Sequence, residues 1–145
     1  QEACGAEIFR IAGIYGPGRN VFKSLYDGSA RIIDKPNHLF NRIHQSDISQ
    51  IIMAAMQSPE RGRILNLADM HPASQADLFH FAASLAGLTP PEPIPLEQAN
   101  LSEMGRSFYT AQRKIRSKIL GQTLRYSFTY PDYKAGLRAL FEAGE

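Results

Sequence analysis

The chain has 145 residues, of which 43% are hydrophobic and 21% are charged. These values match ordinary globular domains and exclude a disordered or collagen-like protein. No apolar run approaches the roughly 20 residues of a membrane-spanning helix, so we expect a soluble protein. The single cysteine, Cys4, fits a reducing cytoplasm, and the dispersed Cys and His residues have no zinc-site spacing. A net charge of only +2 reflects a small excess of basic residues and does not indicate a strongly cationic surface.

The chain is organised around residues 7–19, EIFRIAGIYGPGR. The run from Ile8 to Ile14 does not alternate apolar with polar residues, which is typical of a parallel strand covered on both faces. It breaks into the turn 15–19, and a helical pattern follows at 20–26. Because ligands in open α/β sheets bind at the carboxyl ends of strands, we predict a ligand-facing loop here.

The next elements predict a wound parallel sheet. Residues 30–34 and 39–44 are two predicted short strands on either side of a turn, a hairpin region. Ser46 is the predicted cap of a helix over 46–57, and residues 64–68 form a second two-sided strand. Together the helix and the strand form the second part of a βαβ unit, in which the chain returns through a helix to a parallel strand.

A further helix is predicted from Ser74, with Asp77 in the position of a capping box and Gly87 as its end. Residues 88–104 then change in composition, because four prolines prevent a regular central strand. We therefore expect a small appended lobe in this part of the chain.

The last third of the chain predicts three more elements. A helix is expected from Thr110 to Gly121, a strand at 125–130, and a final helix with Pro131 in its first turn. The apolar side of the final helix consists of Tyr133, Leu137, Leu140 and Phe141.

Basic residues are concentrated between Arg106 and Arg125, including Arg113. Such a segment could bind phosphate groups of a nucleic acid. The simpler interpretation, which we prefer, is the solvated face of a helix whose other side is buried.

Five segments carry a family resemblance. RIAGIYGPGR at 10–19 resembles the second half of NAD(P)-dependent epimerase/dehydratase-type proteins, in the extended or atypical branch of the short-chain dehydrogenase/reductase superfamily. The segments that continue the resemblance in family order are NRIHQSDIS at 41–49, GRILNLAD at 62–69, RKIRSKILG at 113–121 and YPDYKAGLRAL at 130–140.

The resemblance implies an α/β fold: the carboxyl-terminal part of a Rossmann-like doubly wound parallel sheet over 1–145, with a small substrate-side α/β lobe near 88–130. It also implies a parent oxidoreductase or isomerase acting on a small polar substrate. NAD or NADP would be bound mostly by an amino-terminal half, and we expect this chain to be a fragment that lacks that half. The oligomeric state is not predicted.

The same resemblance supplies candidate site residues. It places the loop after the first strand beside the nicotinamide and the substrate, which makes Gly13, Tyr15 and Gly16 candidates for cofactor contacts. The candidates for substrate binding are Pro17, Gly18, Arg19, Arg42 and His44.

Each of these candidates also has a simpler interpretation. The three glycines do not have the spacing of the dinucleotide fingerprint, and glycines with Pro17 also make an ordinary tight turn. Arg19 could pair on the surface, and His44 could hold the start of the following helix. Gly13 and Phe40 stand where nucleotide-sugar members often carry Asn and Arg, which argues against a uridine-diphosphate sugar as substrate.

No catalytic residue is predicted in this chain. The family uses a Tyr-x-x-x-Lys pair, in which the lysine lowers the pKa of the tyrosine for proton exchange. Tyr130 and Lys134 match this spacing, but Pro131 places Tyr130 at a helix entrance, and the family pair is expected before residue 1. The alternative to an enzyme is a non-catalytic, dinucleotide-sensing or regulatory module of the same fold.

Overall fold

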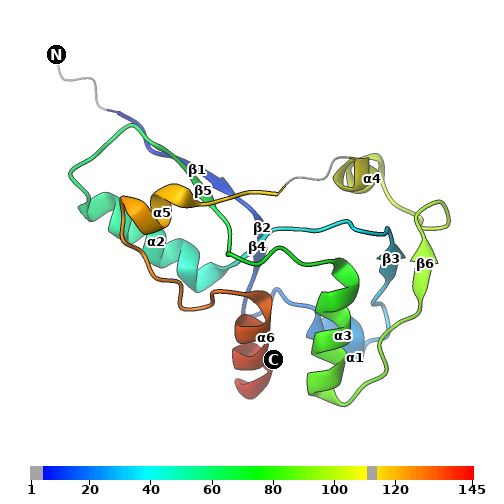
Figure 1. Cartoon of the computed structure of the whole chain (residues 1–145). Coiled ribbons are helices and arrows are strands. Elements are labelled where there is room, and N and C mark those ends of the chain that lie inside the picture. The colour runs from blue at the N-terminus through cyan, green and yellow to red at the C-terminus, as the bar shows by residue number, and fades with distance from the viewer. Residues whose placement is uncertain (1–4, 111–113) are drawn as a thin grey trace.

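The computed structural model describes residues 5–110 and 114–145, so Cys4 and Arg113 lie outside the described residues. Within them strands and helices are interspersed along the chain, and the last elements, α4 to α6, are helices (Figure 1). In chain order the elements are β1 (Ile8–Ile11), β2 (Gly13–Tyr15), α1 (Phe22–Tyr26), β3 (Ile32–Asp34), β4 (Arg42–His44), α2 (Gln45–Gln57), β5 (Ile64–Leu67), α3 (Gln75–Ala86), β6 (Pro93–Pro95), α4 (Glu103–Thr110), α5 (Lys118–Gln122) and α6 (Tyr133–Glu142).

The strands form parallel pairs, which confirms the predicted α/β class. β1 pairs with β5, β2 with β4, and β3 with β6. The single strand predicted over 8–14 is two strands, because the chain changes partner at its centre. Ala12 donates its amide hydrogen to Leu67 on the β5 side at 2.9 Å, whereas Gly13 donates to Asn41 on the β4 side at 3.1 Å.

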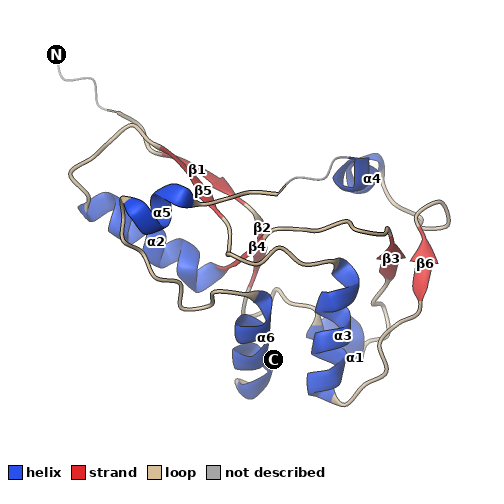
Figure 2. Ribbon diagram, viewed as in Figure 1, coloured by secondary structure: helices blue, strands red, loops and turns tan. Residues whose placement is uncertain are grey.

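The described residues cover only one face of the β1–β5 pair. Leu65 is fully buried against α2 and α5, which lie on one side of the pair (Figure 2). Ile8 and Ile64 are register partners on the opposite face, and they are 51% and 45% exposed. The expectation that this strand is covered on both faces is therefore wrong for the described residues.

The predicted hairpin between residues 30 and 44 is also wrong. β3 and β4 do not pair with each other, because β3 takes β6 as its partner and β4 takes β2. Figure 1 shows the β3–β6 pair and α4 well away from β1 and β5.

The extent of the lobe, 88–130, stays a prediction. Within that range Tyr109 packs with Ile33 of β3, whereas Leu120 packs with Leu65 of β5.

The expected cap of α2 is displaced by two residues. Its N-cap is His44, whose ring nitrogen Nδ1 accepts a hydrogen bond from the Ser46 amide at 3.2 Å. Ser46 is therefore inside the helix and does not cap it.

The carboxyl-terminal third departs most from the predictions. Thr110 ends α4 instead of beginning a helix, residues 114–117 are not helical, and 125–130 form no strand. The amides of Thr129 and Tyr130 donate to the carboxylate of Asp47, so they are unavailable to a strand partner.

The final helix, α6, has the predicted apolar side. Tyr133, Leu137 and Leu140 are buried, whereas Phe141 is 37% exposed. Pro131 lies just before the N-cap residue of α6, outside the first turn where it was expected.

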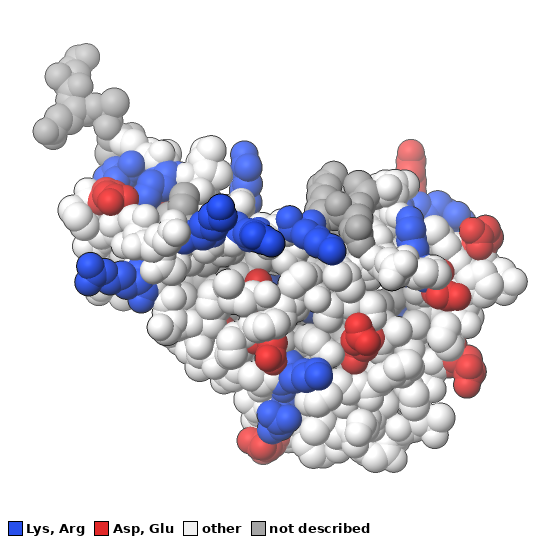
Figure 3. Space-filling view, viewed as in Figure 1, with Lys and Arg blue, Asp and Glu red and all other residues white. Residues whose placement is uncertain are grey.

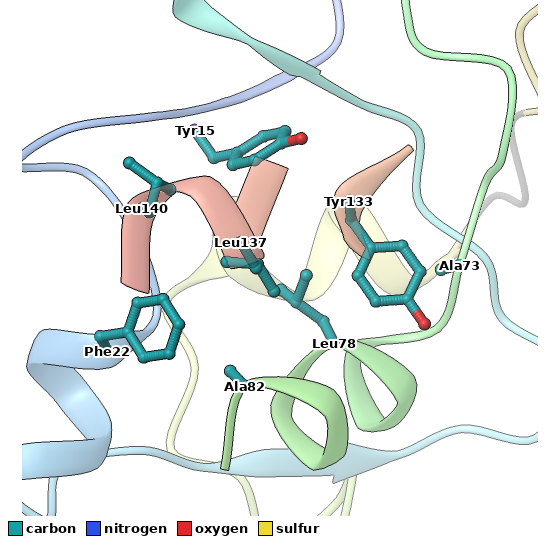
Figure 4. Packing of buried hydrophobic residues seen from close by; sticks show 8 residues of the cluster. All are labelled: Tyr15, Phe22, Ala73, Leu78, Ala82, Tyr133, Leu137 and Leu140. Atoms are coloured by element: carbon teal, nitrogen blue, oxygen red, sulfur yellow. The ribbon is translucent and has the colours of Figure 1, made fainter. Parts of the chain in front are cut away.

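A hydrophobic cluster joins α6 to α3 and α1. In Figure 4, Leu137 and Leu140 project from α6 toward Leu78 and Ala82 of α3 and toward Phe22 of α1. Tyr15, at the end of β2, belongs to the same cluster, so the end of β2 packs against α6.

The start of α3 confirms the predicted capping box and gives a first testable prediction. The Ser74 hydroxyl accepts the Asp77 amide at 2.9 Å, and the Asp77 carboxylate accepts the Ser74 amide at 3.2 Å. Replacing Ser74 by Ala should lower the free energy of unfolding by about 1 kcal/mol, because one helix amide loses its acceptor. Urea unfolding measures this, and Ser49→Ala within α2 is the matched control, with an expected change below about 0.5 kcal/mol.

Candidate functional site

The turn after β2 is held by hydrogen bonds between its own backbone groups. Gly16 and Arg19 exchange backbone hydrogen bonds of 3.0 Å in both directions, and Gly18 donates its amide hydrogen to the Glu145 carboxylate at 2.8 Å. The amides of Gly16 and Gly18 therefore already have partners within the chain. Pro17 and Arg19 are exposed.

Gly16 packs closely against the side chain of Gln45, the first residue of α2. A Cβ atom at this position would lie 2.6 Å from Cγ of Gln45. A larger residue would therefore require this exposed side chain to shift. Such a packing contact favours glycine without a cofactor contact.

Tyr15 and His44 are brought together at the carboxyl ends of β2 and β4. They are register partners, and their rings meet edge to face with centroids 5.2 Å apart. The Tyr130 ring lies 4.0 Å from the His44 ring, and the Tyr15 hydroxyl donates to the Asp132 carbonyl at 3.3 Å. Burial, followed by the charge of Asp69, raises the pKa of Tyr15 well above its ordinary value.

His44 is held as a neutral ring. Its Nδ1 accepts the Ser46 amide hydrogen, so the ring proton of the neutral form lies on Nε2. Burial lowers the pKa of His44, and the charge of Asp47 opposes this shift only in part. This contact supports the interpretation in which His44 holds the start of α2.

Arg42 ties β4 to the loop before α3. Its guanidinium donates to the carbonyl of Ala73 at 2.9 Å and to that of Phe40 at 3.2 Å. Burial lowers the pKa of Arg42, and the nearby Asp69 charge opposes the shift. Gly13 is the register partner of Arg42, and a Cβ there would lie 3.3 Å from the Asn41 carbonyl oxygen.

Two buried carboxylates were not predicted as part of this region. Asp47 in the first turn of α2 is fully buried, and it binds residues 126–130. Asp69, which follows β5, is 3% exposed and lies close enough to Tyr15 and Arg42 to affect the pKa of each. The signal for Asp69 was an acidic residue directly after a two-sided strand, where a parallel sheet collects polar groups.

The Tyr130 and Lys134 match to the catalytic motif is not a pair in space. Tyr130 lies against His44, whereas Lys134 Nζ lies 5.8 Å from the centroid of the Phe81 ring.

Two cavities lie elsewhere in the described part of the chain. The first, about 180 Å³, lies between β3, the turn at 35–38 and the start of α3. The Lys35 ammonium donates to the Tyr109 carbonyl there, and His38 Nε2 lies 3.0 Å from the Phe108 carbonyl. The second, about 350 Å³, is lined by Ile64, Asn66, Arg116, Ser117, Lys118 and Leu120. Neither cavity is lined by the eight candidate site residues named from the sequence.

Basic side chains are exposed along the segment that leads into α5, namely Lys114, Arg116 and Lys118. Figure 3 shows Lys and Arg gathered over this part of the molecule, with Asp and Glu scattered over the rest of the visible face. The segment is not one continuous basic helix, because residues 114–117 have no helical structure.

The described residues contain no group of three or more His, Cys, Asp or Glu side chains that could hold a metal ion. Their helices are also too short or too polar for any of them to cross a lipid bilayer.

The fold of this chain, with its parallel strand pairs and surrounding helices, is shared with about half of each of two solved proteins named as an epimerase family protein and a dehydratase. This confirms the resemblance at the level of the fold. No protein-family model matches the sequence.

Individual proteins show how far this similarity extends. A conserved protein of unknown function from Silicibacter pomeroyi is 39% identical, with a TM-score of 0.90 over 94% of this chain and 49% of that one. The human epimerase family protein SDR39U1, solved with NADPH, is 18% identical, with a TM-score of 0.77 over 95% of this chain and 48% of its own. dTDP-glucose 4,6-dehydratase from Bacillus anthracis, solved with NAD, is 14% identical, with a TM-score of 0.69 over 96% of this chain and 45% of its own.

Among curated proteins, Protein YeeZ of Escherichia coli strain K12 is 32% identical over 87 residues, which are 59% of this chain and 30% of YeeZ. The chain thus spans less than a third of YeeZ in that match, and about half of each solved structure compared above.

Proposed function

We propose that this chain is the substrate-side half of an NAD(P)-dependent oxidoreductase or isomerase of the epimerase/dehydratase type. The other half of the sheet would bind most of the dinucleotide and supply the Tyr-x-x-x-Lys pair. The protein would act on a small polar molecule, and we place it in the cytoplasm.

The uncovered face of β1–β5 carries this proposal. Ile8 and Ile64 are large apolar residues on adjacent strands, and about half of each is exposed. Parallel sheets are normally covered on both faces, because the helices of their crossovers lie there. A second layer packed on Ile8 and Ile64 would therefore complete the sheet, as the other half of a doubly wound fold does.

The free edge of β1 supports the same conclusion. Ile8 and Ala12 donate their amide hydrogens toward β5, to Arg63 and Leu67. Amide directions alternate along a strand, so the backbone amides of Phe9 and Ile11 point to the other edge of β1. No described strand pairs with β1 at that edge. Another parallel strand fits this edge.

The residues of this chain do not fit a primary dinucleotide site. The amides of Gly16 and Gly18 are bonded to Arg19 and Glu145, and the glycine spacing differs from the fingerprint. When bound elsewhere, the dinucleotide would supply hydride transfer. This chain would contribute the ends of β2 and β4 to the wall facing the nicotinamide, with the buried Tyr15 and His44 holding these strand ends in position.

The cavity beside β3 supports a small polar substrate. Its volume, about 180 Å³, is below that of most drug-sized pockets, and Lys35, His38 and Gln75 are among its polar lining residues. Such a cavity fits the polar part of a compact molecule better than a whole nucleotide sugar.

A non-catalytic, dinucleotide-sensing module is the second candidate. Tyr130 and Lys134 are not paired in space, so neither candidate gains a catalytic pair from the described residues, and the other half decides between the two. A catalytic Tyr-x-x-x-Lys pair in the other half would favour the enzyme, and its absence would favour the sensor.

Dinucleotide binding tests the proposal. The protein expressed from its whole reading frame should bind NADH or NADPH with a Kd in the micromolar range, measured by cofactor fluorescence, whereas residues 1–145 alone should show no saturable binding. A whole protein that binds neither dinucleotide would contradict the proposal. If a Tyr-x-x-x-Lys pair is present, Tyr→Phe in it should abolish turnover and preserve binding, as an enzyme requires and a sensor does not.

A further inference from the structure

Asp69 is a buried carboxyl group with fewer hydrogen-bond partners than an ionised carboxylate needs. It is 3% exposed, and its Oδ1 accepts one hydrogen bond, from the His71 amide at 3.3 Å. Its Oδ2 is buried without a hydrogen-bond partner in the described residues. No described Lys, Arg or His nitrogen lies within 4.0 Å of this carboxyl group.

The same chain holds its other buried carboxylate quite differently. Asp47 is fully buried, but both of its oxygens accept hydrogen bonds, from the Tyr126 hydroxyl at 2.6 Å and the amides of Thr129 and Tyr130 at 2.8 and 3.1 Å. A buried carboxyl group without comparable partners favours its neutral form, because a lone buried charge costs far more than a protonated acid.

The charged and titratable groups around Asp69 come from each element packed against it. Tyr15 faces it from β2, Arg42 from β4, His71 from the following loop and Asp132 from the N-cap of α6. Arg42 gives some compensation, but its guanidinium is already bonded to the Ala73 and Phe40 carbonyls. Asp132 is a like charge and opposes ionisation.

These neighbours link Asp69 to the start of α6. Met70 donates its amide hydrogen to the Pro131 carbonyl at 3.3 Å, and the Tyr15 hydroxyl donates to the Asp132 carbonyl at 3.3 Å. The Asp132 carboxylate caps α6 by accepting the Ala135 amide at 2.8 Å. A negative charge on Asp69 would therefore act on the residue that caps the helix.

We propose that Asp69 is a proton-sensitive group beside the start of α6, neutral in the folded protein at mildly acidic pH, whose ionisation loosens the first turn of α6. This device is independent of the proposed enzymatic function, because every group in it belongs to the described chain.

The direction of the pH effect follows from proton binding. Burial raises the pKa of Asp69 from its ordinary 3.8 to about 7, against the smaller opposing effects of the His71 amide and Arg42. Between these values the folded state holds a proton that the unfolded state has released. Stability attributable to Asp69 is therefore complete below about pH 4 and is lost as the pH rises to about 7.

Carbon-13 NMR of the protein tests this directly. The carboxyl carbon of Asp69, assigned by its loss in Asp69→Asn, should titrate with a midpoint near pH 7 in the wild-type protein. A midpoint close to the ordinary value would overturn the proposal, and this measurement does not depend on how well the variant folds.

Hydrogen exchange tests the link to α6. At pH 8 the amides of Ala135 and Gly136 should exchange at least about threefold faster in the wild-type protein than in Asp69→Asn, and the two proteins should agree near pH 5. Asp34→Asn, which removes an exposed carboxylate of β3, is the matched control and should behave like the wild type. Equal exchange in wild type and Asp69→Asn at both pH values would show that Asp69 does not act on α6.

Discussion

Replacing Asp47 by Ala should destabilise the protein by about 3–5 kcal/mol, because the side chain is the central hydrogen-bond acceptor for residues 126–130. Its removal leaves the Tyr126 hydroxyl and the amides of Thr129 and Tyr130 without their acceptor. It also removes a negative charge from the first turn of α2, where the helix dipole favours it. Urea unfolding followed by circular dichroism measures the loss.

Two further variants separate the causes of that loss. Asp34→Ala removes an exposed carboxylate and should change stability by less than about 0.5 kcal/mol. Asp47→Asn keeps the shape and one acceptor oxygen but presents an amide donor to one of its former donors, so an intermediate loss is expected. If Asp47→Ala costs no more than Asp34→Ala, residues 126–130 are not held by this carboxylate.

The ionisation of Tyr126 reports the same contact through a spectroscopic signal. Burial raises the pKa of its hydroxyl, and the hydrogen bond to Asp47 and the charge of that group raise it further. In Asp47→Ala the tyrosine should therefore ionise at lower pH than in the wild type, a shift that ultraviolet difference spectroscopy can follow.

Asp47 also explains why part of the fold could not be predicted from the sequence. The alternating pattern at 125–130 resembles a strand, but the amides of Thr129 and Tyr130 bind a carboxylate 82 and 83 positions earlier in the chain. Local patterns carry no information about such a partner. By contrast, the start of α3 depends on Ser74 and Asp77, three residues apart, and it was predicted correctly.

The parallel strands were predictable for a different reason. Apolar runs such as the one from Ile8 identify strands whatever their partner, but they do not identify which strand pairs with which. The change of partner between Ala12 and Gly13 depends on two separate strands, β5 and β4, so the run was predicted as one strand.

The candidate site also contains residues that could be predicted from the sequence and a residue that could not. Tyr15 and His44 were named from a resemblance, and the structure places them side by side. Asp69 was not named, because its significance lies in the lack of hydrogen-bond partners for a buried atom. That property exists only in three dimensions.

Gly136→Ala should destabilise the protein by about 2–3 kcal/mol, although alanine is the better helix former by roughly 1 kcal/mol. Gly136 lies inside α6, where the Tyr15 ring crosses the helix. A Cβ atom at this position would lie 2.6 Å from Tyr15 Cε2 and 2.7 Å from Cζ, and it would also collide with the hydroxyl oxygen. Tyr15 is buried and joins β2 to the cluster of α6, so it cannot move without opening that cluster.

We expect the loss of stability in Gly136→Ala to come from the collision with Tyr15 and not from a change in the helix itself. A double-mutant cycle distinguishes these two causes. Tyr15→Leu removes the ring, so adding Gly136→Ala to it should cost at least about 2 kcal/mol less than adding it to the wild type. Gly121→Ala in α5 is the matched control, since a Cβ there meets no atom within 4 Å and should be neutral or slightly stabilising. If Gly136→Ala costs the same with and without the Tyr15 ring, the close approach of β2 to α6 is not what requires a glycine.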